Sequence, residues 1–148
     1  MMATSEFAAA KILIVDDNPV NVNLMERMLA RAGYSCVTST MDPMAVWGLY
    51  RRNHYDLVIL DLQMPAFDGF QVMKALRETE DKDGLFILVT SAEPGHKMRS
   101  LQAGAKDFVS KPFQIPDLIT RIHALLRMKS EGETADGEVA TSKAAVQH

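Results

Sequence analysis

The sequence predicts an α/β fold in which five helices cover a doubly wound, five-stranded parallel sheet. Short apolar runs alternate with segments whose apolar residues recur at helical spacing. Several of these runs are continuously apolar, which is typical of strands buried on both faces of a sheet. Strands that alternate with helices in this way form parallel sheets through right-handed crossovers.

Each predicted strand is a short apolar or β-branched run bounded by polar or turn-forming residues. The run before Asp61, Leu57-Val58-Ile59-Leu60, is apolar throughout, so we expect it to be central. Cys36, the single cysteine, lies in the second run, where a small buried residue is expected rather than a reactive thiol. The predicted strands cover residues 11–15, 35–38, 57–60, 85–90 and 107–110.

The predicted helices carry start and stop signals as well as apolar periodicity. Asn18-Pro19 and Asp42-Pro43 each place a capping side chain before a proline at the first helical position. Gly33 is a typical helix end, and 65–69 is expected to be a loop before the third helix. The five helices are predicted from Pro19 to Gly33, from Pro43 through Tyr50, from Phe70 through Leu76, over 96–103 and over 116–128.

Composition and charge limit the classes of protein to which the chain can belong. A length of 148 residues, with 47% hydrophobic and 24% charged residues, suits one globular domain. Residues 11–129 carry 15 basic and 14 acidic side chains, so this part offers no basic surface for nucleic acid. No apolar stretch approaches the roughly 20 residues that span a bilayer, and no secretory signal is present. We therefore expect a cytoplasmic protein without membrane contact.

Polar residues that suit phosphate chemistry follow the predicted strands. Asp16 and Asp17 follow the first strand, Asp61 the third, and Lys111 the fifth, while Thr90 ends the fourth. Because ligands bind beyond the carboxyl ends of parallel strands, these side chains should lie together. Three carboxylates would repel one another without a cation, and an oxygen-only ligand set suits Mg²⁺. A carboxylate can accept a phosphoryl group, while lysine and threonine can contact its oxygens.

Residues 11–128 resemble the receiver domain of two-component response regulators. The resemblance implies the CheY-like, flavodoxin-like strand order 2-1-3-4-5. It divides the chain into a flexible N-terminal segment (1–10), a receiver domain (11–129) and a flexible acidic tail or linker (130–148). The motifs that carry it are Val15-Asp16-Asp17-Asn18, Asp61-Leu62-Gln63-Met64-Pro65 with Asp68-Gly69, Thr90-Ser91-Ala92, Gly104-Ala105 and Lys111-Pro112-Phe113.

The resemblance also implies roles for individual residues. Asp61 would be the phosphoacceptor, and Lys111 would pair with it and then contact the phosphoryl group. Mg²⁺, or Mn²⁺ in its place, would be bound by Asp17, Asp61 and the backbone carbonyl of Gln63, with Asp16 acting mainly through a metal-bound water. The switch residues would be Thr90, which turns inward on phosphorylation, and Phe108, which rotates with it.

The expected partner is a sensor histidine kinase or a histidine phosphotransfer protein, and the resemblance allows a phosphorylation-dependent dimer. The domain would be a regulatory phosphoacceptor rather than an enzyme, although it would assist its own phosphorylation and dephosphorylation. Two alternatives stay open. One is a metal-dependent aspartyl-phosphate hydrolase, which commonly places a second acid two residues after the nucleophile, where this chain has Gln63. The other is a receiver-like binding module that works without phosphorylation.

Overall fold

The central feature of the structure is a five-stranded parallel sheet in the order β2-β1-β3-β6-β7. The structure is a computed structural model that describes residues 7–65, 67–79 and 85–143. In chain order the sheet strands are numbered 2-1-3-4-5, so the predicted fold and strand order are confirmed. The sheet strands are β1 (Lys11–Val15), β2 (Cys36–Thr40), β3 (Leu57–Asp61), β6 (Phe86–Ser91) and β7 (Asp107–Ser110).

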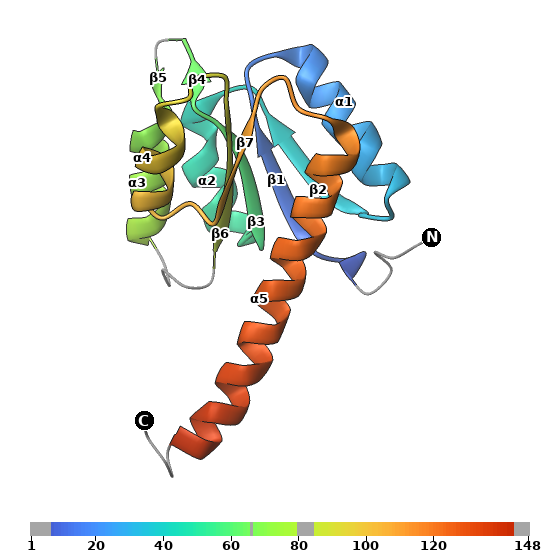
Figure 1. Ribbon diagram of the computed structural model, residues 1–148, viewed down its shortest axis with the longest axis vertical. Coiled ribbons are helices and arrows are strands. Elements are labelled where there is room, and N and C mark those ends of the chain that lie inside the picture. The colour runs from blue at the N-terminus through green and yellow to red at the C-terminus, as the bar shows by residue number, and fades with distance from the viewer. Residues whose placement is uncertain (1–6, 66, 80–84, 144–148) are drawn as a thin grey trace.

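Helices cover both faces of this sheet, as Figure 1 shows: α1 and α5 lie on one face, and α2, α3 and α4 on the other. A single turn of 3₁₀ helix, η2 (Pro43–Ala45), leads into α2. The helices are α1 (Pro19–Arg31), α2 (Val46–Asn53), α3 (Gly69–Thr79), α4 (His96–Gln102) and α5 (Ile115–Lys143).

The two faces of the sheet contribute to two separate hydrophobic clusters. Successive side chains of a strand point to opposite faces. Ile12 and Ile14 therefore pack with residues of α1 and α5, whereas Leu13 and Val15 pack with residues of α2 and α3. Burial on both faces explains why the runs in β1 and β3 are apolar throughout.

Both predicted capping side chains bind backbone amides, although the second caps the 3₁₀ turn η2 and not α2, which begins at Val46. The Asn18 side chain accepts hydrogen bonds from the backbone amides of Val20 (2.9 Å) and Asn21 (3.4 Å). Asp42 accepts one from the amide of Met44 at 2.9 Å. These contacts satisfy amides that have no partner within the first turn of a helix.

Two local predictions are wrong, one about a strand residue and one about a loop. Cys36 is exposed, because it begins β2, which is an edge strand and pairs with β1 alone among the described strands. The expected loop over 65–69 is partly paired: β5 (Phe67–Asp68) forms a short antiparallel ladder with β4 (Gln63–Met64). The burial of an edge strand and the pairing of two-residue strands both depend on contacts with residues that are far away in the sequence. Local sequence signals do not indicate such contacts.

The last helix is longer than predicted. We expected it to end at Met128, but α5 continues to Lys143, and Figure 1 shows it projecting well beyond the sheet. No proline interrupts residues 129–143, and the two glycines there each cost only about 1 kcal/mol in a helix. The connection expected after α3 lies largely outside the described residues. Among the described helices, α5 included, none combines the length and the apolarity that crossing a membrane requires.

Candidate functional site

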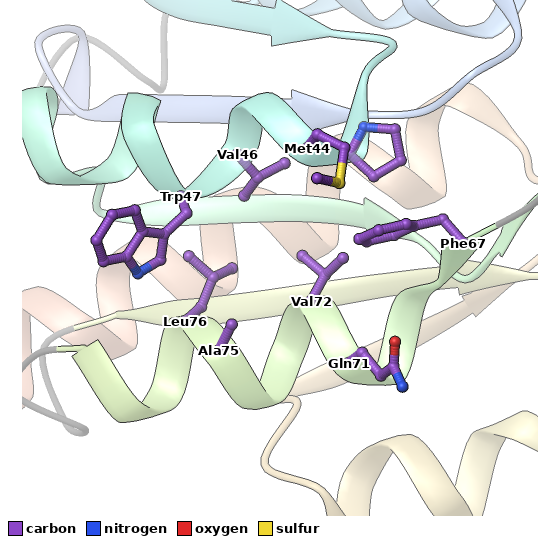
Figure 2. Close-up of a pocket in the computed structure, with 9 residues that line it drawn as sticks. Met44, Val46, Trp47, Phe67, Gln71, Val72, Ala75 and Leu76 are labelled. Carbon is purple, nitrogen blue, oxygen red and sulfur yellow. The ribbon is translucent and has the colours of Figure 1, made fainter.

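An apolar pocket lies between the η2–α2 segment and α3 (Figure 2). Its volume is about 190 Å³, and Trp47 lies at one end of it while Met44 and Phe67 lie at the other. The lining contains no ionisable side chain, so this pocket has no group that could accept or transfer a phosphoryl group. The lining residues are Pro43, Met44, Val46, Trp47, Phe67, Gln71, Val72, Ala75 and Leu76.

The titratable groups gather instead at the carboxyl ends of β1 and β3. Asp16 and Asp17 directly follow β1, and Asp61 is the last residue of β3. One carboxylate oxygen from each of these residues lies within 4.8 Å of the others. Asp16 and Asp61 are only 1% and 2% exposed, whereas Asp17 is half-buried. The structure therefore brings together the three predicted carboxylates, two of them in a buried setting.

The environment of Asp16 opposes its negative charge. Burial raises the pKa of this carboxyl above its usual value, and the nearby charge of Asp61 raises it further. A hydrogen bond from the backbone amide of Asn18 to Asp16 Oδ1 (2.9 Å) lowers the pKa and offsets part of this effect. Crowded carboxylates with oxygen-only donors fit a hard divalent cation, which would relieve their mutual repulsion.

Lys111 supplies the positive charge of the site. Its Nζ lies 3.2 Å from Asp61 Oδ1 and 3.5 Å from Asp16 Oδ2. The side chain is 19% exposed, so its ammonium group can face an incoming ligand while it contacts both carboxylates. The peptide bond from Lys111 to Pro112 is cis, and the backbone amide of Lys111 donates to the carbonyl of Ser91 at 3.0 Å.

The segment after β3 holds Asp61 in place. The backbone amide of Gln63 donates to Asp61 Oδ1 at 2.9 Å. Gly69 lies so close that a Cβ atom there would be 2.8 Å from the Cα of Leu62 and 3.3 Å from the carbonyl oxygen of Asp61. The glycine of the Asp68-Gly69 motif thus allows α3 to begin directly against the backbone of Asp61 and Leu62.

The two predicted switch residues lie on the neighbouring strands. Thr90 of β6 is in register with Asp61 of β3 and is 1% exposed. Its hydroxyl has no hydrogen-bond partner among the described residues. Phe108 of β7 is in register with Val89, and its buried ring belongs to the hydrophobic cluster on the α2–α3 face. The structure therefore places Thr90 beside Asp61 and Phe108 on the next strand, and the motion of both stays a prediction.

Two residues near the site, Ser91 and His96, carry no role in the sequence-based prediction. Ser91 Oγ and His96 Nδ1 are 2.8 Å apart, although five positions separate the residues. The side chain of Gln63 also makes an unpredicted contact, because its Oε1 accepts the backbone amide of Ala92 at 2.6 Å. Both contacts depend on the path of the loop 92–95, which no sequence periodicity indicates.

The fold is that of a CheY-like α/β signalling domain. Residues 12–123 match the family model of the response regulator receiver domain. The chain is 35% identical over 131 residues to the response regulator MprA of Mycobacterium sp. (strain KMS), a match that covers 88% of this chain and 56% of that protein. The chain belongs to the response regulator receiver family.

Solved structures agree with this assignment. The receiver domain of the Francisella response regulator 1452 superposes with a TM-score of 0.72 at 27% identity, over 80% of this chain and 98% of that one. The chemotaxis protein CheY4 of Vibrio cholerae gives a TM-score of 0.73 at 28% identity, over 80% and 99% of the two chains. The chain spans about half the length of the curated relatives that it matches.

Proposed function

We propose that Asp61 accepts a phosphoryl group from a phosphohistidine donor and that the phosphorylated site drives a conformational switch. The observation that carries the proposal is the buried Asp61 carboxylate, with the Lys111 ammonium 3.2 Å away and two further carboxylates beside it. The donor would be a sensor histidine kinase or a histidine phosphotransfer protein in the cytoplasm. Within the chain, we propose residues 11–129 as the receiver unit and 130–148 as a linker.

The group transfer requires a nucleophile and compensation for negative charge. A carboxylate oxygen of Asp61 would attack phosphorus, and the P–N bond of the phosphohistidine would break with its electron pair remaining on the imidazole nitrogen, which then takes a proton. Lys111 would exchange its contact with Asp61 for one with a phosphoryl oxygen. Asp16, Asp17, Asp61 and the backbone carbonyl of Gln63 would hold Mg²⁺ or Mn²⁺. When bound, such an ion neutralises charge on the transferred group.

Thr90 is the element through which the site would signal. A buried hydroxyl without a partner is costly, and a phosphoryl oxygen at Asp61 would offer it an acceptor. Movement of Thr90 would free space for Phe108, which belongs to the adjacent strand β7. The phosphoryl contacts would thus bias a packed element between two arrangements, which protein partners or a second copy of the chain could distinguish.

A surface beside Lys111 supports docking of the donor on the α1 side of the site. A hollow of about 410 Å³ is lined there by residues of α1 and of the segments after β6 and β7. Val20 and Leu24 of α1 are 71% and 37% exposed, although both are apolar. Contiguous exposed apolar residues next to a reactive group are typical of a protein interaction surface. The lining residues are Asn21, Leu24, Ala92, Lys111, Pro112 and Phe113.

The decisive experiment is incubation with a small phosphodonor such as acetyl phosphate, with Mg²⁺ or with EDTA, followed by intact-protein mass spectrometry. We expect a base-labile adduct of about 80 Da on the wild type, as for one phosphoryl group on a carboxylate. The adduct should be absent from Asp61→Asn and from the samples in EDTA. Asp117→Asn, which changes a more exposed carboxylate on α5, is the matched control and should be modified like the wild type.

Failure of the wild type to form the adduct with bound Mg²⁺ would refute the proposal and favour a phosphorylation-independent binding module. Continuous release of phosphate from a small ester, at many turnovers per protein, would favour a hydrolase instead. A receiver would instead accumulate the adduct on Asp61 and would not turn over the phosphate ester.

A further inference from the structure

The loop that follows Thr90 is anchored by a buried serine. Ser91 is fully buried, and its Oγ accepts the backbone amide of Glu93 at 3.0 Å. The same oxygen lies 2.8 Å from His96 Nδ1, at the start of α4. A hydroxyl both donates and accepts, so this oxygen can satisfy the Glu93 amide and the imidazole together.

The imidazole of His96 is itself held by α3. It packs edge to face on the ring of Phe70, with 5.4 Å between the centroids. The guanidinium of Arg99, one turn further along α4, lies 3.7 Å from the centroid of the same ring. His96 is thus confined by aromatic contact with α3 on one side and by the hydrogen bond to Ser91 on another.

The residues next to Ser91 line the phosphoacceptor site. Thr90 precedes it, and the carbonyl of Ser91 accepts the backbone amide of Lys111 at 3.0 Å. Ala92, which follows it, donates its amide to Gln63 Oε1 at 2.6 Å. A displacement of Ser91 would therefore move Thr90, the backbone of Lys111 and the Ala92 amide at once.

We propose that His96 is a positioning residue for phosphoryl transfer, acting through Ser91 to hold Thr90 and the loop 91–93 in the arrangement that receives the phosphoryl group. The inference rests on the proposed function, and it assigns to α4 and Phe70 of α3 a direct mechanical connection to the site. Preorganised donors accelerate a reaction because they need no rearrangement during it. Loss of the connection should therefore slow the transfer without removing any group that touches the phosphate.

Three substitutions separate the hydrogen bond from simple packing. His96→Phe keeps a ring against Phe70 and removes the bond, whereas His96→Asn loses the ring but retains a polar group near the position of Nδ1. Ser91→Ala removes the other partner of the bond. His123→Phe is the matched control, because His123 also packs edge to face on a phenylalanine, Phe7, and its Nδ1 has no hydrogen-bond partner among the described residues.

Amide hydrogen exchange tests the connection without phosphoryl chemistry. In His96→Phe, we expect exchange at Ala92 and Glu93 to accelerate about tenfold, as for the loss of one buried hydrogen bond. The exchange rates of these two amides should lie within about threefold of wild type in His96→Asn and should equal the wild-type rates in His123→Phe. Unchanged exchange at both amides in His96→Phe would overturn the inference, as would an equal acceleration in His96→Asn.

Phosphorylation kinetics with acetyl phosphate test the consequence. The rate at saturating Mg²⁺ should fall about tenfold in His96→Phe and at least as far in Ser91→Ala, which also removes the acceptor of the Glu93 amide. The double variant should be no slower than Ser91→Ala, because both changes break the same hydrogen bond between Ser91 and His96. Mg²⁺ affinity should stay as in the wild type. Multiplicative losses in the double variant, or a wild-type rate in His96→Phe, would overturn the inference. A wild type that takes no phosphoryl group would refute the proposed function, while hydrogen exchange would still decide whether His96 holds the loop.

Discussion

Replacing Lys111 by methionine should destabilise the protein strongly when no divalent cation is present. Methionine preserves much of the length of the side chain but removes the ammonium group that lies 3.2 Å from Asp61 and 3.5 Å from Asp16. Both carboxylates are almost fully buried, so water cannot replace the lost charge. The two acids would then face each other, and Asp17, without a compensating cation.

The size of the effect follows from these distances. At an effective dielectric constant of about 20, each lysine–carboxylate pair is worth about 5 kcal/mol of gross attraction. Recovery of the hydration of the ammonium group and relaxation of the acids offset much of this, and removing one partner of a buried pair costs about 3–5 kcal/mol. Because Lys111 is 19% exposed, we predict a loss of about 3 kcal/mol in the free energy of unfolding.

Urea unfolding in EDTA and in saturating Mg²⁺ measures this loss, with the fluorescence of the single tryptophan as one probe and circular dichroism as another. The deficit should shrink to about 1 kcal/mol in Mg²⁺, because a cation bound to the native state stabilises it and compensates the same carboxylates. Lys74→Met, an exposed position on α3, should change stability by less than about 0.5 kcal/mol. A Lys111→Met protein as stable as the wild type in EDTA would contradict the electrostatic argument.

Two further predictions concern packing and titration away from the charged cluster. Gly69→Ala should lose about 2–3 kcal/mol in urea unfolding, because its Cβ would lie 2.8 Å from the backbone of Leu62, whereas Gly95→Ala, which meets nothing within 4 Å, should be nearly neutral. Tyr34→Phe should gain about 1 kcal/mol at pH 8, because the Tyr34 hydroxyl is buried without a partner among the described residues. Burial raises the pKa of Tyr34 from 10.0 to about 12. The native state therefore holds this proton longer than the unfolded chain, and wild-type stability should fall as pH rises from 10 toward 12. The same titration of Tyr34→Phe should lack this component, and parallel pH profiles for the two proteins would show that the hydroxyl is not buried as described.

Much of the site was predictable because local signals mark where strands and helices end. Asp16 and Asp61 end continuous apolar runs, which predict strands and not helices. Because the carboxyl ends of parallel strands meet at one edge of the sheet, the topology alone brings these two acids together. The caps at Asn18 and Asp42 are equally local, since each side chain bonds to an amide two residues away. The family resemblance added the strand order, which the alternation of elements leaves open.

Other features depend on contacts that local sequence does not encode. The exposure of Cys36 is one example, because it depends on what packs around the edge strand β2 and not on the residues next to it in sequence. The helix α5 continues past Met128 because nothing in the following residues stops it, although their apolar pattern has ended. Propensity and periodicity describe a segment by itself, whereas exposure and element length also depend on what packs against it.

Three features follow from the amino-acid sequence alone: the class of fold, the carboxyl-terminal edge of the sheet at which the acids meet, and the resemblance that points to Asp61. Three features required the folded structure: Lys111 also contacts Asp16, the buried Thr90 hydroxyl has no hydrogen-bond partner within the described part of the chain, and His96 reaches Ser91. The physical reason is the range of the forces involved. Helix caps and strand periodicity act over a few neighbouring residues, while the charge balance and the hydrogen bonds of the site arise between segments that meet only when the sheet and its helices have packed.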